Sequence, residues 1–330
     1  MLDRLHTIDQ SLLDDFQRDF PLVPRPFAEM ARRIGIGEDE VIDRLKALQS
    51  GGAVTRVGAT VRPNTAGAST LAALAVPEDK IDDVAALVGQ EDGVNHSYLR
   101  EHDWNLWFVA TAPDAVALNR SLARIKTRSG LPLLDLRLKR PFNIDLGFSL
   151  RGRTARPCST TDADLSVLRE SDRPILHGLS RGLALVPRPF AALASQLGLG
   201  ESALIARIRA LCDARLITRI GVIVRHRAVG WSSNAMVVWN LPESLIEAAG
   251  KKLARVPGVT LCYQRDTVPG VWPYGLFSMI HARSRPDALT VLARAAALPE
   301  LAGADHRVLF STRCFKQTGA QLEDRSEGRV

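Results

Sequence analysis

The pattern of apolar and polar residues divides the N-terminal part of the chain into short helices. Apolar residues recur at helical spacing over residues 5–16, and similar stripes predict helices over residues 27–33 and 38–49. Glycines follow each of the last two stripes, as expected where helices end. Residues 54–62 instead alternate in the manner of strands, and we expect a strand pair that turns at Gly58. Three helices and a small hairpin predict a winged helix-turn-helix.

A second pattern follows, in which strands alternate with amphipathic helices. The order is strand, helix, strand, strand, helix, strand, which is typical of a ferredoxin-like domain. Such a domain covers one face of its sheet with helices and leaves the other face open. The predicted elements are residues 69–76, 78–89, 93–100, 104–112, 113–128 and 133–142.

The whole unit then occurs a second time. The letters LVPRPF at residues 22–27 recur unchanged at residues 185–190, and the similarity continues without a gap through the wing strands. Later, the glycine, tyrosine and arginine of residues 93–101 recur in residues 258–266. The elements of the second copy are predicted at residues 165–176, 190–196, 201–213, 217–225, 232–239, 242–255, 258–265, 274–282, 285–297 and 305–315.

The repeat predicts an α+β fold of two tandem copies. In each copy a winged helix-turn-helix precedes a ferredoxin-like βαββαβ domain, and we expect the two open sheet faces to cover each other in a covalent pseudo-dimer. The joint is rich in Gly, Pro, Ser and Thr and reads as an exposed linker. The expected boundaries are 1–66 and 67–150 for copy one, 151–161 for the linker, and 162–229 and 230–330 for copy two.

Charge and composition narrow the classes of function. The 330 residues carry 43 Lys+Arg against 36 Asp+Glu, a net charge of +7, which favours an anionic partner without choosing between nucleic acids and small carboxylates. No apolar stretch approaches the about 18–20 residues that cross a bilayer. The N-terminus has no apolar signal core, so we expect a cytoplasmic protein. The four cysteines stand far apart, which argues against disulfides and thiolate metal sites.

The order of the parts resembles the Lrp/AsnC family of transcription regulators, which makes DNA binding one candidate function. The predicted recognition helices disagree with it. In copy one the helix opens with Glu38, Asp39 and Glu40, where a DNA-reading helix presents Arg, Lys, Asn, Gln or Ser. Copy two is less acidic, but Ala203 and Ala206 leave little to read bases with. We therefore expect scaffold domains without specific DNA binding.

The strands of the ferredoxin-like domains carry side chains that are costly to bury for packing alone. Successive odd or even positions of a strand share a face. One face in copy one would therefore present His96, Tyr98, Arg100 and His102. The next strand of copy one adds Trp107, and the matching segments of copy two add Tyr263, Arg265, Trp272 and Tyr274. Aromatic walls with Arg and His suit a flat, conjugated, polyanionic ligand, and an aromatic core with charged hairpins is the alternative.

A basic triplet, Arg225, His226 and Arg227, follows the wing strands of copy two only. Copy one has Arg62, Pro63 and Asn64 there. The copies have therefore specialised, which suits a pocket built asymmetrically from both, although a solvated turn would look the same.

These windows resemble one branch of the Lrp/AsnC-like proteins, the sirohaem decarboxylases of d1-type haem biosynthesis and of the alternative haem pathway. These enzymes have two types of subunit, NirD-like and NirL-like. The string REHDWNLWF at residues 100–108 resembles the NirD-like type, so the first half of the chain is NirD-like and the second half is NirL-like. Trp104 stands where Tyr is usual and Gly275 where Asn is usual, so neither is given a polar role. The segments that resemble the NirL-like type of subunit are residues 224–227, 262–265, 272–281 and 309–316.

The resemblance implies removal of CO₂ from two acetate side chains of sirohaem. The sequence contains no Gly-rich phosphate loop, active-site lysine motif or metal cluster, so we expect no separate cofactor and no metal of the chain's own. Arginines would hold the carboxylates, histidine would protonate the remaining carbon, and tyrosines would orient the acetate. Ligation of the substrate's iron by one histidine is the alternative role. The candidates are Arg100, Arg225, Arg227 and Arg265; His102 and His226, with His96 next; and Tyr98 and Tyr263.

Several alternatives stay open at this point. A tetrapyrrole sensor without activity would present the same windows. The residues do not decide whether one pocket or two carry the reactions, which ring positions react, or whether two chains form a homodimer.

Overall fold

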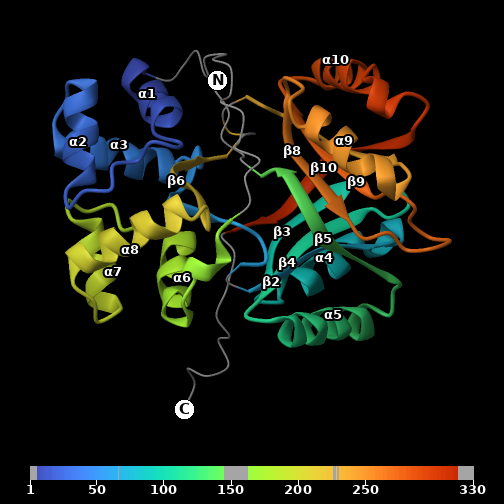
Figure 1. Ribbon diagram of the computed structural model, residues 1–330, viewed down its shortest axis with the longest axis horizontal. Helices are drawn as coiled ribbons and strands as arrows, with labels where there is room; N and C mark the ends of the chain where they lie inside the picture. Colours follow the sequence, from blue (N-terminus) through green and yellow to red (C-terminus); the bar gives the residue numbers. More distant parts are fainter. Residues whose placement is uncertain (1–5, 66, 145–162, 226–227, 229, 319–330) are drawn as a thin grey trace. The chain divides into compact units, whose positions relative to one another are not determined.

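The computed structural model describes residues 6–65, 67–144, 163–225, 228 and 230–318 (Figure 1). These residues form two compact units, and each copy of the repeat contributes to both. The first unit holds the helix-turn-helix parts of the two copies, and the second holds the two ferredoxin-like parts. No helix in the described part of the chain is long and apolar enough to cross a membrane.

The described residues of the helical unit form three α-helices from each copy. Copy two departs from its predicted first helix over residues 165–176, which is wrong. Two short 3₁₀ turns occupy Leu165–Val167 and Glu170–Asp172, and the helix starts only at Arg173. Pro174 explains the late start, because a residue without an N–H fits only the first helical turn. The helices are α1 (Thr7–Asp15), α2 (Pro26–Ile34), α3 (Glu38–Ser50), α6 (Arg173–Arg181), α7 (Pro189–Gln196) and α8 (Glu201–Asp213).

The predicted wing hairpin is also wrong. Residues 54–62 contain one continuous strand, β1 (Val54–Val61), which pairs antiparallel with β6 (Ile217–Val224) of the other copy. Gly58 stands opposite Gly221, and neither glycine makes a turn. Each permits a close approach instead, because an added Cβ would lie 2.4 Å from the carbonyl oxygen of Leu179 at Gly58 and 2.2 Å from that of Gln17 at Gly221. The two wings thus form one shared two-stranded sheet.

The repeated LVPRPF letters build the same corner twice. The proline after the arginine stands in the first turn of α2 or α7, and the phenylalanine is fully buried. The arginine forms an ion pair with the first residue of the next helix, Arg25 with Glu38 and Arg188 with Glu201. The identical letters therefore have identical structural tasks.

The second unit is a closed eight-stranded barrel. Each copy forms the predicted four-stranded sheet, and the strand order around the barrel is β10-β3-β4-β2-β5-β8-β9-β7. Two junctions between copies close it, β3 with β10 and β5 with β8. The strands are β2 (Ala68–Leu74), β3 (Val94–Arg100), β4 (Leu106–Ala112), β5 (Leu133–Asn143), β7 (Ser233–Asn240), β8 (Val259–Arg265), β9 (Leu276–Ala282) and β10 (Asp305–Gln317).

The pseudo-dimer is confirmed by the way the apolar residues divide. Helices α4 (Ile81–Gly89) and α5 (Ala115–Ser129) cover the outer face of the first sheet, and α9 (Glu243–Leu253) and α10 (Arg285–Ala296) cover the second (Figure 1). The inner faces meet in a separate core. Its members are Ala73, Trp107, Leu134, Leu136, Met236, Val238, Trp272, Tyr274, Phe277 and Leu309.

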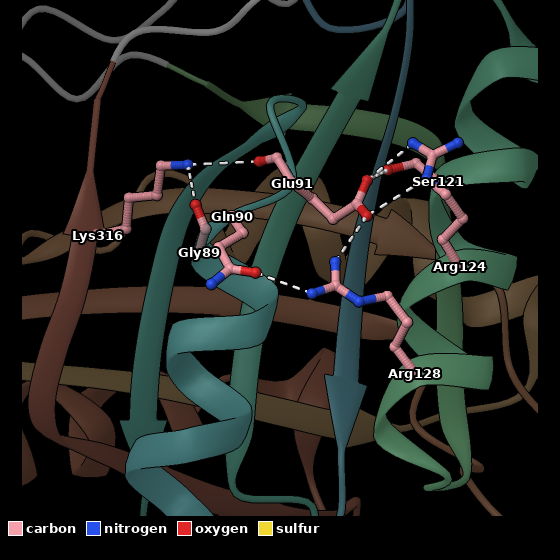
Figure 2. A network of polar contacts seen from close by, with 7 residues as sticks. All are labelled: Gly89, Gln90, Glu91, Ser121, Arg124, Arg128 and Lys316. Carbon is pink, nitrogen blue, oxygen red and sulfur yellow. Dashed lines mark hydrogen bonds and ion pairs between the residues drawn. The ribbon is translucent and has the colours of Figure 1, made fainter.

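A polar network ties the helices of copy one to a strand of copy two (Figure 2). Glu91 is buried after α4 and accepts hydrogen bonds from Ser121 Oγ at 2.9 Å and Arg124 Nη2 at 2.8 Å, both on α5. Burial alone would raise the pKa of Glu91, but these bonds bring it below its ordinary value. Lys316 Nζ on β10 donates to the carbonyl of Gly89 at 2.7 Å. The network stabilises the junction between β3 and β10.

Candidate active site

Three of the predicted site residues lie together on β3, inside the barrel. Tyr98 stands opposite Trp107 of β4, whose side chain belongs to the inner core. The rings of His96 and Tyr98 stack with centroids 6.5 Å apart. The guanidinium carbon of Arg100 lies 5.5 Å from the centroid of the Tyr98 ring. Strand alternation places these three side chains on one face, as expected.

His102 does not lie on this strand, so its predicted place on the shared face is wrong. The strand ends at Arg100, whose backbone N–H donates to the carbonyl of Asn105 at 2.8 Å and closes a turn. Within the turn, His102 Nδ1 accepts the backbone N–H of Trp104 at 3.0 Å. The imidazole instead meets Trp272 of copy two edge to face, with ring centroids 5.4 Å apart.

Trp272 is the centre of an aromatic cluster drawn from both copies. Its ring centroid lies 5.2 Å from that of Trp107 and 5.1 Å from that of Tyr274. Its side chain is only 1% exposed, and its indole N–H has no hydrogen-bond acceptor among the described residues. A buried N–H without an acceptor costs folding free energy, so a ligand atom that accepts a hydrogen bond from it would gain binding free energy.

The surroundings of His102 favour its neutral form. Burial lowers the pKa of His102, Arg307 lowers it further, and Asp103 opposes both. Because Nδ1 already accepts a hydrogen bond, the neutral ring carries its hydrogen on Nε2. The ring can accept a proton only when that bond from Trp104 is given up.

The second Tyr-Arg pair lies at the other junction between the sheets. The guanidinium carbon of Arg265 lies 5.1 Å from the ring centroid of Tyr263, and its Nη1 donates to the carbonyl of Leu136 on β5 at 2.9 Å. Arg100 donates in the same way to the carbonyl of Leu309 on β10 at 3.0 Å. Burial lowers the pKa of Arg265 to about 10, which leaves it charged at neutral pH, and raises the pKa of Tyr263. Each arginine thus joins its own copy to the other.

Two residues that fix the His102 turn were missed by sequence reasoning. Glu101 accepts two hydrogen bonds of 2.8 Å from Arg285 of copy two. Asn105 accepts the backbone N–H of Val76 at 3.0 Å and donates to the carbonyl of Val76 at 2.8 Å. Both residues stand in the REHDWNLWF string, which was the available signal. The turn is therefore held at both ends.

The structure describes only the first residue of the basic triplet of copy two. Arg225 belongs to the helical unit, where its backbone N–H donates to the carbonyl of Ala53 at 2.8 Å at the end of β6. His226 and Arg227 lie outside the described residues. The part of the chain that the structure describes holds no group of three or more His, Cys, Asp or Glu side chains that could bind a metal ion.

Known proteins resemble this chain along nearly all of its length. The profile of the AsnC-like ligand binding domain matches residues 66–142 and 228–316, and that of the siroheme decarboxylase NirDL-like HTH domain matches residues 9–54 and 172–217. The siroheme decarboxylase NirDL subunit of Paracoccus denitrificans is 62% identical over 96% of this chain and 98% of its own. The NirD subunit of Pseudomonas aeruginosa is 46% identical over 43% of this chain and 95% of its own.

A solved structure extends this similarity to three dimensions. It is a siroheme decarboxylase NirDL in complex with an iron-uroporphyrin III analogue. Its TM-score is 0.65 at 28% identity, over 95% of this chain and 93% of that one.

Proposed function

Because the chain belongs to the siroheme decarboxylase NirDL family, we propose that it removes CO₂ from two acetate side chains of sirohaem, giving didecarboxysirohaem in d1-type haem biosynthesis. The observation that carries this proposal is the cluster inside the barrel, where His102 of copy one meets Trp272 of copy two. A composite cluster of this kind is what a fusion of two unlike subunits would supply. The ligand named for the solved relative, an iron-uroporphyrin III analogue, is a macrocycle of the same class.

The inner wall offers the contacts that such a macrocycle needs. Trp107 and Trp272 are each 1% exposed in the inner core and would give flat apolar contacts to a ligand that displaces neighbouring side chains. The indole N–H of Trp272 would add a buried donor. Arg100 and Arg265 place positive charge at the two junctions for the carboxylates of the substrate. Tyr98 and Tyr263 lie beneath the two guanidinium groups and would orient an acetate.

The reaction asks for one proton at each acetate. When CO₂ leaves, the C–C bond breaks and its electron pair stays on the side-chain carbon, delocalised into the macrocycle. A proton on that carbon then gives the methyl group. His102, in its imidazolium form, is the donor that we favour, and it is reloaded from solvent. His226 is the second candidate and His96 the third.

The remaining polar candidates belong to the same proposal. Arg225 and Arg227 would add cations for the carboxylates. Ligation of the substrate's iron by one histidine, in place of proton donation, is the alternative role. The proposal needs no separate cofactor, because the macrocycle itself takes up the electron pair.

Ion pairs inside the helical unit support a scaffold role for its helices. Arg44 of α3 is engaged by Asp9 at 3.1 Å and Glu40 at 2.8 Å. Arg207 of α8 is engaged by buried Asp172 at 2.5 Å. Cations held in this way are poorly placed to neutralise phosphates, so we infer that specific DNA binding is not the function.

Anaerobic incubation with sirohaem, followed by mass spectrometry of the extracted tetrapyrrole, tests the proposal. We expect a product lighter than sirohaem by two molecules of CO₂. A tetrapyrrole sensor would change the Soret band of sirohaem and return it unaltered, which would overturn the proposal. A regulator would instead bind DNA in a salt-dependent way and leave sirohaem unaltered, which would also overturn the proposal.

A further inference from the structure

A row of polar side chains crosses the inner wall of the barrel from the junction of β3 and β10. Arg100 Nη1 donates to Oδ1 of Asn234 on β7 at 3.2 Å, in addition to the carbonyl of Leu309. Asn234 stands opposite His281 of β9, and its Nδ2 lies 2.9 Å from Nε2 of that ring. The other ring nitrogen, Nδ1, lies 2.7 Å from Thr260 Oγ1 on β8. We call Arg100, Asn234, His281 and Thr260 the polar row.

The strand alternation places the middle of the polar row inside the barrel. Asn234 lies two residues before Met236 on β7, and His281 lies four residues after Phe277 on β9, so each shares a face with a member of the inner core. His281 is 6% exposed. A buried imidazole that is bonded at both nitrogens is a defined part of the wall, and the chemistry proposed above leaves it without a task.

The direction of every bond in the polar row follows from its ends. A guanidinium only donates, so Asn234 turns its oxygen to Arg100 and its N–H to His281. Nε2 of His281 therefore accepts, and the ring's hydrogen lies on Nδ1, where it donates to Thr260 Oγ1. The Thr260 hydroxyl donates in turn to the carbonyl of Met279 at 3.1 Å. Each bond has one donor and one acceptor only while His281 is neutral.

Among the residues that the structure describes, the matching place in copy one shows no such row. There the paired residues of β2 and β4 are Ser69 and Thr111, and Thr111 Oγ1 accepts from Asn95 Nδ2 at 3.3 Å. Arg265, the counterpart of Arg100, donates to the carbonyl of Leu136 and meets no side-chain acceptor within the described ranges. The two copies therefore hold their arginines differently.

We propose that Asn234 and His281 are positioning residues that hold Arg100 ready for a carboxylate of the bound tetrapyrrole. This inference rests on the proposed function of the barrel. An arginine has many rotamers, and a ligand that must order it binds more weakly. The polar row fixes the guanidinium in advance at one junction and leaves the other to its backbone contact. The two arginine sites, although related by the repeat, are thus unequal.

Substitutions in the polar row test the proposal through binding. His281→Leu removes both ring nitrogens, and we expect it to raise the dissociation constant for iron-uroporphyrin III, followed through its Soret band, about tenfold. The KM for sirohaem should rise in parallel while kcat changes little. His281→Gln should restore most of the affinity, because its carboxamide oxygen can accept from Asn234. Thr111→Val is the matched control in copy one and should leave the dissociation constant within about twofold.

A double-mutant cycle separates positioning from general damage to the wall. In an Arg100→Gln background, His281→Leu should weaken binding no further, since the side chain that it positions is gone. The proposal is overturned if His281→Leu lowers the affinity equally with and without Arg100, or if it leaves the dissociation constant unchanged. It is also overturned if Thr111→Val lowers the affinity as much as His281→Leu does. If His281→Leu does not fold, Asn234→Ser, which places the residue of copy one in copy two, is expected to give the same pattern. Because binding is measured apart from turnover, a parent chain that binds iron-uroporphyrin III without decarboxylating sirohaem refutes only the proposed function.

Discussion

At the scale of single residues, the site combines side chains whose placement was predictable with one whose placement was not. Alternation along β3 was enough to put His96, Tyr98 and Arg100 on one face. The same rule failed at His102, because the bond between Arg100 and Asn105 ends the strand first. The partner of His102, Trp272, comes from the other copy, and no local pattern predicts such a contact.

Replacing the proposed proton donor separates binding from chemistry. His102→Gln keeps a polar side chain in the turn but cannot deliver a proton, so kcat should fall by about 100-fold or more. The dissociation constant for iron-uroporphyrin III, measured by absorbance titration, should stay within about threefold of the parent value. His226→Gln applies the same measurement to the second candidate. If neither variant lowers kcat, histidine is not the proton donor.

The lowered pKa of His102 predicts the pH dependence of the reaction. The imidazolium that donates the proton is populated only below the pKa, which burial and Arg307 hold under the ordinary value of 6.5. We therefore expect kcat/KM to rise as the pH falls through this range below 6.5, and to decline toward neutrality. The profile of His102→Gln should lack this limb. If kcat/KM of the parent chain does not change between about pH 5 and 7, the imidazolium of His102 is not the proton donor.

At the scale of elements, the helices followed from apolar spacing except at the start of α6, whereas the wing did not. Val54–Val61 alternates like any strand, and Gly58 reads locally as a turn. Its actual constraint comes from Leu179, which lies in the other copy and leaves no space for a Cβ. A close approach between distant segments has no sequence signature beyond the glycine itself.

The close approach at Gly221 makes a specific stability prediction. Gly221→Ala would place a Cβ against the backbone at Gln17, where no flexible side chain can move away, and should lower the free energy of unfolding of the helical unit by about 3 kcal/mol. Gly200→Ser is the control, because Gly200 caps α8 with no atom within 4 Å of an added Cβ. The control should change stability by less than about 1 kcal/mol in denaturant unfolding. Equal stabilities for the two variants would contradict the close packing of β6.

The repeat also supplies a matched pair of ion pairs that differ in burial. Asp172 and Arg207 of copy two occupy the places of Asp9 and Arg44 in copy one, but the Asp172 side chain is 1% exposed and that of Asp9 is 17% exposed. Asp172→Asn removes a buried carboxylate charge and leaves the partly buried guanidinium of Arg207 without its counter-charge, which should cost about 3 kcal/mol of unfolding free energy. Asp9→Asn should cost less than about 1 kcal/mol. Denaturant unfolding of both variants checks this, and a larger loss for Asp9→Asn would reverse the argument.

At the scale of the whole molecule, the sequence predicted two copies whose open sheet faces cover each other, and the inner core confirms this. Closure into one barrel was not predicted, because it depends on edge pairing between β5 and β8 and between β3 and β10. Edge pairing is set by register across the junctions, which a repeat alone does not specify. The closed barrel explains why the aromatic cluster and the polar row each contain residues of both copies.

The most direct test of the account is whether one chain completes both decarboxylations by itself. The purified chain, in excess over sirohaem and without any other protein, is quenched at intervals under anaerobic conditions, and the tetrapyrroles are weighed by mass spectrometry. We predict a transient loss of one CO₂ followed by complete conversion to the product that has lost two. Sirohaem that stays unaltered, or that stops after one loss until another protein is added, would contradict the account.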